Sequence, residues 1–107
     1  MQHTITARHC EIPDDLRARA REILDRMGEI AGRPVEGTAL FDVSGVGRTV
    51  ELRLHVSKGD LLVAKAEADD HRSALDKAEG KLRRQATKAG APPRRSREIP
   101  VEAQPEI

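Results

Sequence analysis

Within residues 48–57, apolar and polar side chains alternate from Thr49 onward, and this pattern constrains the fold more than any other feature of the chain. Four aliphatic residues would share one face of a strand and four polar residues the other. In chain order they are Thr49, Val50, Glu51, Leu52, Arg53, Leu54, His55 and Val56. A half-buried strand of this kind predicts a sheet with one face against a core and one face in water.

Three more strands are expected, over residues 2–8, 38–44 and 61–68. The first is rich in β-branched side chains, and the last places small alanines on one face, which leaves room for helices to pack closely. Glycine-containing turns at 45–47 and 58–60 join the last three strands. These strands are therefore predicted to be antiparallel neighbours.

Two helices complete the pattern. Pro13, with acidic residues directly after it, indicates a helix start, and apolar spacing continues to about residue 31, where Gly32 ends the helix. A second helix begins after a cap at Asp69 or Asp70 and runs to about Lys88. The order β-α-β-β-β-α predicts one α+β domain over residues 1–90, with a four-stranded sheet and both helices packed on one face.

Composition narrows the function. Aromatic residues make up 1% of the 107 residues and Phe41 is the sole example, so base stacking on aromatic rings is not available. One cysteine, no apolar stretch long enough for a membrane and no secretory pattern at the start favour a cytoplasmic protein. Residues 91–107 combine Pro, Arg and Glu without periodicity and are expected to form a disordered tail.

The second helix carries the clearest functional signal. Lys77, Lys81, Arg84 and Lys88 recur at intervals of 4, 3 and 4 residues and so lie on one stripe, which we call the cationic stripe. A stripe like this is often an ordinary solvated surface. However, like charges at this spacing repel each other, and a polyanionic partner would explain why the helix tolerates them. The net charge of the whole chain is only +1, so the argument rests on where the charges lie.

The remaining basic residues, the histidines and the cysteine each have a structural as well as a functional interpretation. Arg83 and the tail arginines extend the basic character, and Arg8 with His9 forms either a surface loop or a second phosphate contact beside the stripe. The four histidines and Cys10 lack the spacing of a metal or nucleophile site, and His71 is expected to be semi-buried. No catalytic residue, metal or cofactor is predicted, so the chain is not expected to be an enzyme.

Two segments resemble the ribosome hibernation-promoting factor family. One is Ala66-Glu-Ala-Asp-Asp70 with Ala74-Leu-Asp76, Lys81-Leu-Arg-Arg-Gln85 and Lys88, and the other is the opening strand and turn over residues 5–13. The resemblance covers about residues 2–89. The chain departs from the usual pattern where Arg72 replaces an aromatic residue, Ala7 a glycine and Pro13 a threonine.

This resemblance implies a double-stranded-RNA-binding-like fold that docks on the small ribosomal subunit near the decoding centre, blocking mRNA and tRNA sites during stasis. Its partners would be the small subunit and its rRNA, with no membrane and no small-molecule substrate. The RNA contacts carried over are Arg8, Lys77, Lys81, Arg83, Arg84 and Lys88. The chain is expected to be a short-type factor or an isolated N-terminal domain, so ribosome dimerisation and the holding of single ribosomes both remain open.

One alternative function comes from another class of protein. The polar side of residues 48–57, with Thr49, Glu51, Arg53 and His55, could dock a partner protein, and the cationic stripe would then serve only solubility.

Overall fold

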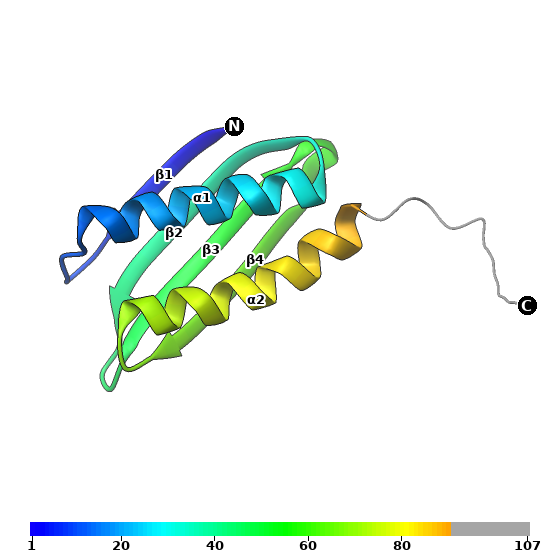
Figure 1. The fold of residues 1–107 in the computed structure, drawn as a ribbon. Coiled ribbons are helices and arrows are strands. Elements are labelled where there is room, and N and C mark those ends of the chain that lie inside the picture. Colours follow the sequence, from blue (N-terminus) through cyan, green and yellow to red (C-terminus); the bar gives the residue numbers. More distant parts are fainter. Residues whose placement is uncertain (91–107) are drawn as a thin grey trace, which may run out of the picture.

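The computed structural model of the chain describes residues 1–90, the Lys58 side chain excepted (Figure 1). Its elements are β1 (Gln2–Ala7), α1 (Asp14–Ala31), β2 (Pro34–Val43), β3 (Arg48–Val56), a short 3-10 helix η1 (Ser57–Gly59), β4 (Leu61–Ala68) and α2 (His71–Gly90). The predicted order β-α-β-β-β-α is confirmed. The predicted disordered tail, residues 91–107, lies outside the described residues.

The four strands form one mixed sheet in the order β1-β2-β3-β4. Strand β1 is parallel to β2, whereas β2, β3 and β4 are antiparallel neighbours as predicted. Both helices cover the same face of this sheet, and they lie side by side across it (Figure 1). Within residues 1–90 no helix covers the other face, which explains why the strands alternate apolar and polar residues.

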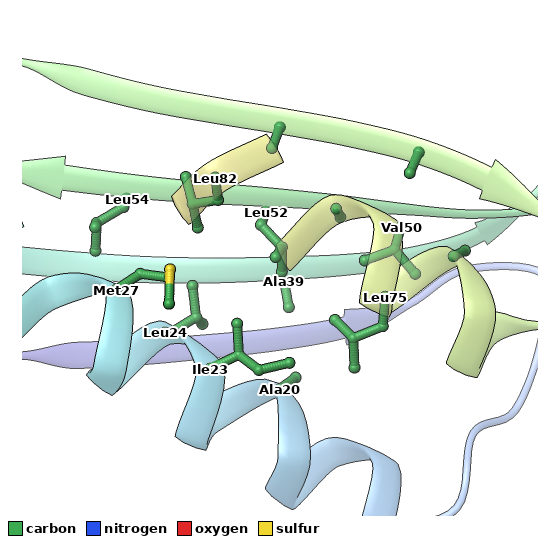
Figure 2. Close-up of a cluster of buried hydrophobic side chains, with 14 of the residues drawn as sticks. Ala20, Ile23, Leu24, Met27, Ala39, Val50, Leu52, Leu54, Leu75 and Leu82 are labelled. Carbon is green, nitrogen blue, oxygen red and sulfur yellow. The ribbon is translucent and has the colours of Figure 1, made fainter. Parts of the chain in front are cut away.

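The core lies between the sheet and the two helices and is almost entirely aliphatic. Val50, Leu52 and Leu54 of β3 are fully buried, and they meet Leu24 of α1 and Leu82 of α2 (Figure 2). Phe41 on β2 is also fully buried. The sole aromatic residue is therefore a core residue, and its ring is not offered to a partner.

Element boundaries differ from the prediction in a few places. Strand β2 begins at Pro34, because a bulge between Pro34 and Glu36 lets the proline stand at the first position of the strand. Helix α2 continues to Gly90. The buried side of α2 ends at Ala86, and Ala89 in the following turn is exposed.

The start of α2 follows the predicted capping. The backbone N–H of Ser73 donates to Asp70 Oδ1 at 2.7 Å, so Asp70 is the capping residue.

Within residues 1–90, no helix is long and apolar enough to cross a membrane.

Candidate nucleic-acid interface

The cationic stripe runs along the flank of α2 that overhangs strand β4, which is one edge of the sheet. Lys81 Nζ donates to the carbonyl oxygen of Lys65 at 2.8 Å, and Lys77 Nζ lies 3.4 Å from that of Glu67. These carbonyls belong to alternate residues of β4 and point away from the sheet. The two ammonium groups are thus held at the outer edge of β4 while both side chains remain exposed.

Gln85 anchors the same flank of α2 to β4. Its Nε2 donates to the Val63 carbonyl at 2.6 Å, and the Val63 N–H donates to its Oε1 at 3.1 Å. One amide therefore satisfies both outward backbone groups of an edge-strand residue. Sequence reasoning missed this role, although Gln85 lies four residues after Lys81 and so continues the line of contacts along the helix.

Arg84 and Lys88 complete the stripe and are exposed. Among the described residues neither has an ion-pair or hydrogen-bond partner, and no carboxylate forms an ion pair with any of the four stripe residues. The hydrogen-bond partners of Lys77 and Lys81 are neutral carbonyls, which do not offset a positive charge. The stripe consequently presents four uncompensated positive charges on one surface.

Arg83 lies on the opposite flank of α2, toward α1. Its guanidinium is 3.5 Å from Glu79, which also contacts Arg19 and Arg26 of α1. The structure therefore separates Arg83 from the stripe and groups it with two arginines that the sequence reasoning did not select. Arg19 and Arg26 are seven residues apart, a spacing that puts them on one face of a helix and could have indicated them.

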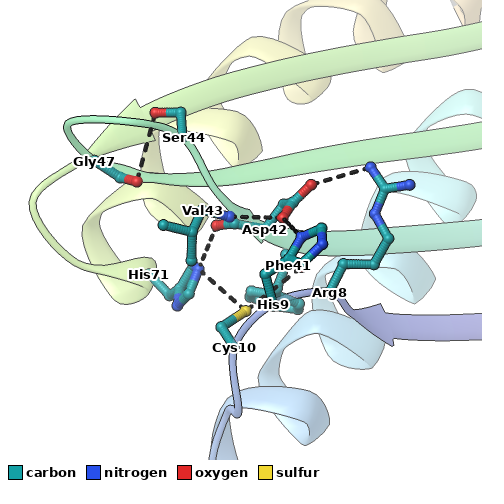
Figure 3. A network of polar contacts seen from close by, with 9 residues as sticks. All are labelled: Arg8, His9, Cys10, Phe41, Asp42, Val43, Ser44, Gly47 and His71. Carbon is teal, nitrogen blue, oxygen red and sulfur yellow. Dashed lines mark hydrogen bonds and ion pairs between the residues drawn. The ribbon is translucent and has the colours of Figure 1, made fainter.

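Arg8 does not lie beside the stripe, and that prediction is wrong. It follows β1, whereas the stripe contacts β4 at the other edge of the sheet. Arg8 instead pairs with Asp42 at 3.0 Å, and His9 Nδ1 lies 3.1 Å from the other oxygen of the same carboxylate (Figure 3). The sequence alone does not state which strands form the edges, so it could not exclude this arrangement.

The carboxylate of Asp42 is strongly stabilised in its charged form. The hydrogen bond with His9 and the one from the Val43 N–H, followed by that from Arg8, lower the pKa of Asp42 to about 2. Its negative charge offsets much of the positive charge of Arg8. A phosphate contact at Arg8 would have to compete with this carboxylate.

His71 and Cys10 lie in the same region, and their contacts are structural (Figure 3). His71 Nε2 lies 2.9 Å from the Asp42 carbonyl, and its ring meets Phe41 edge to face at 5.5 Å. Cys10 Sγ is 3.9 Å from the same nitrogen. His71 is half-buried as predicted, and the contacts tie the start of α2 to the end of β2. No group of side chains within residues 1–90 is arranged to hold a metal ion.

The open face of the sheet has a different character from the helix layer. Arg53 lies 3.6 Å from Glu51, so the charges of this pair offset each other. A shallow cavity of about 270 Å³ on this face is lined by Glu36, Thr38, Arg53, His55 and Leu61. With its acidic residues, this face is a poorer surface for phosphates than the stripe.

Residues 3–90 match the family model described as sigma 54 modulation protein / S30EA ribosomal protein. The chain belongs to this family. Its members are non-enzymatic, ribosome-associated factors of the hibernation and translation-inhibitor class, so the resemblance in the sequence and the expectation that the chain is not an enzyme are both confirmed.

Two solved structures share the fold. A ribosomal subunit interface protein from Coxiella burnetii superposes with a TM-score of 0.73 at 22% identity, covering 82% of this chain and 96% of that one. The N-terminal domain of Protein Y from Thermus thermophilus gives a TM-score of 0.70 at 21% identity, covering 82% and 98%. No curated protein matches the chain.

Proposed function

We propose that this protein binds the small ribosomal subunit through the cationic stripe and keeps the ribosome inactive during stasis. The observation that carries the proposal is the stripe itself: four exposed cations on one helix flank, none paired with a carboxylate within residues 1–90, in a family of ribosome-associated factors. The protein would therefore act in the cytoplasm, where ribosomes work.

Binding would depend on phosphates and on the shape of folded RNA. Lys and Arg neutralise phosphates without regard to base sequence. Stacking of bases on Phe, Tyr or Trp rings cannot contribute, because the ring of Phe41 is 0% exposed and the chain has no Trp or Tyr. The domain would then block the mRNA and tRNA sites near the decoding centre by occupying their space.

The protein from Coxiella burnetii is described as a ribosomal subunit interface protein, which supports this location for the present chain. In the present chain, the RNA contacts would be Lys77, Lys81, Arg84 and Lys88. Arg83 would contribute from the other flank of α2, and Arg8 from the far edge of the sheet. Since Arg8 is already paired with Asp42, we rank its contribution below that of the stripe.

Sedimentation of the protein with purified small subunits tests the proposal. The wild type should pellet with the subunits, and binding should weaken with salt with a log–log slope of about 0.9 per phosphate contact, taking the duplex-DNA coefficient as a guide. The double charge reversal Lys81→Glu with Arg84→Glu should abolish pelleting without changing the circular dichroism spectrum.

Failure of the wild type to pellet would refute the proposal and favour the alternative, a protein-interaction module that uses the open sheet face. Pelleting that survives the double reversal would refute the assignment of the stripe.

A further inference from the structure

Three arginines converge on one carboxylate at the seam between α1 and α2. Arg19 Nη2 lies 3.6 Å from Glu79 Oε1, and Arg26 Nη1 and Arg83 Nη2 each lie 3.5 Å from Glu79 Oε2. Arg19 also pairs with Asp76 at 2.8 Å. Three guanidinium groups therefore meet two carboxylates in ion pairs, and the carboxylate of Glu22 also acts on Arg19.

The exposed fractions show which charges face the solvent. The Glu79 side chain is 15% exposed, whereas those of Arg19, Arg26 and Arg83 are 43%, 53% and 47% exposed. The acid lies beneath the arginines and the guanidinium groups lie above it. An anion approaching Arg26 and Arg83 from outside would meet the guanidinium groups first, whereas the Asp76 side chain beside Arg19 is 60% exposed.

Each guanidinium also has unused hydrogen-bonding capacity. A guanidinium carries five N–H donors, and the carboxylate contacts involve a single nitrogen of each arginine. Arg26 and Arg83 form no other side-chain hydrogen bond or ion pair within residues 1–90. An arginine can hold a carboxylate with one edge and a phosphate with another, and arginine is well suited to phosphate recognition.

The seam and the stripe can act on the same partner. At about 100° per residue, Arg83 lies roughly 120° around α2 from the stripe, with Gly80 between them. A Cβ atom added at Gly80 would meet nothing within 4 Å, so the outer ridge of α2 is low at this point. A surface resting on this ridge can therefore contact both flanks of the helix.

We propose that Arg19, Arg26 and Arg83 form a second phosphate-binding site for an RNA backbone at the α1–α2 seam, and that Glu79 lowers the affinity of this site. The inference rests on the proposed function, because RNA of the small subunit is the ligand. A purely structural ion-pair cluster would also hold the helices together, but it would not make Glu79 an inhibitor of binding.

Neutralising Glu79 separates the two possibilities. Glu79→Gln keeps the shape of the side chain and removes no cation, so it should bind purified small subunits several-fold more tightly than the wild type. Its log–log salt slope should be steeper by up to about 1, the increment of one further phosphate contact. Glu51→Gln is the matched control, because it also frees an arginine, Arg53, but on the open sheet face.

Adding Arg26→Gln to Glu79→Gln should remove the gain, because it takes away one of the freed guanidinium groups. The Glu51→Gln control excludes a mere gain in net charge, since it changes the net charge by the same amount at another place. A wild type that binds, with a Glu79→Gln variant that binds no more tightly, would overturn the inference and leave the proposed function standing. An equal gain in Glu51→Gln would also overturn it. A wild type that does not bind the subunits would overturn both.

Discussion

The two flanks of α2 both hold cations, but they hold them in different ways. On the flank toward β4, Lys77 and Lys81 lie against neutral backbone carbonyls and Arg84 has no ion-pair partner within residues 1–90. On the flank toward α1, the carboxylates of Asp76 and Glu79 pair with Arg83 and with Arg19 and Arg26 of α1. The first flank leaves its positive charges free for a partner, whereas the ion pairs of the second join the two helices.

This difference separates binding from stability. Removing the charge of Arg84 or Lys88 should weaken RNA binding and leave folding nearly unchanged, because exposed residues without specific contacts contribute little to the free energy of unfolding. Removing a seam arginine leaves Glu79, which is largely buried, with fewer partners and should affect both properties.

The largest effect is expected beneath both flanks. Leu82 is fully buried between α2 and the sheet, so Leu82→Ala should lower the free energy of unfolding by about 2–5 kcal/mol. Both flanks of α2 depend on this packing. If α2 moves in the variant, the contacts on both flanks are lost together. Urea denaturation measures the loss. A loss below about 1 kcal/mol would contradict the position of α2 on the core.

A smaller effect should be confined to the β4 flank. Gln85→Leu leaves the outward N–H and carbonyl of Val63 without their partner, which should cost about 1–3 kcal/mol of unfolding free energy. Thr87→Leu, on the exposed side of the same helix, is the control and should stay within about 0.5 kcal/mol of the wild type. Equal stability of the two variants would show that the Gln85 anchor does not matter.

Between the flanks, Gly80→Ala should stabilise the protein by up to about 1 kcal/mol. Alanine is the better helix former, and the added Cβ meets no atom within 4 Å. A rise in the melting temperature measures this effect. A fall would indicate that the helix is distorted at Gly80.

The smallest effect is expected from acid, which should weaken an ion pair between α1 and α2. The hydrogen bond from Arg72 lowers the pKa of Asp15 below its ordinary value of 3.8, so this pair between the helices stabilises the fold above about pH 4. The contribution should be lost as the pH falls below that value and Asp15 becomes protonated. Asp15→Asn should therefore destabilise the protein at pH 6 and converge with the wild type in strong acid. A constant difference at every pH would contradict this account.

The architecture and the cationic stripe could both be predicted from the sequence. Alternation in β3, the proline and glycine signals and the 4-3-4 spacing of cations are local patterns, and each depends on residues a few positions apart. They could be interpreted without knowing which elements become neighbours.

Contacts between distant segments could not be predicted in the same way. The pairing of Arg26 with Glu79 joins residues 53 positions apart, and that of Gln85 with Val63 depends on the position of α2 over the edge strand. Arg8 was misplaced for the same reason, because nothing local in the sequence says that β1 and β4 form opposite edges.

The central claim is that the stripe contacts phosphates, and the salt dependence of binding tests it most directly. Arg84→Gln and Arg53→Gln each remove one exposed arginine, the first from the stripe and the second from the open sheet face. With purified small subunits, Arg84→Gln should reduce the log–log salt slope by about 0.9, the value of one phosphate contact, and Arg53→Gln should leave it unchanged. An unchanged slope for Arg84→Gln together with a reduced slope for Arg53→Gln would contradict the account and place the binding surface on the sheet.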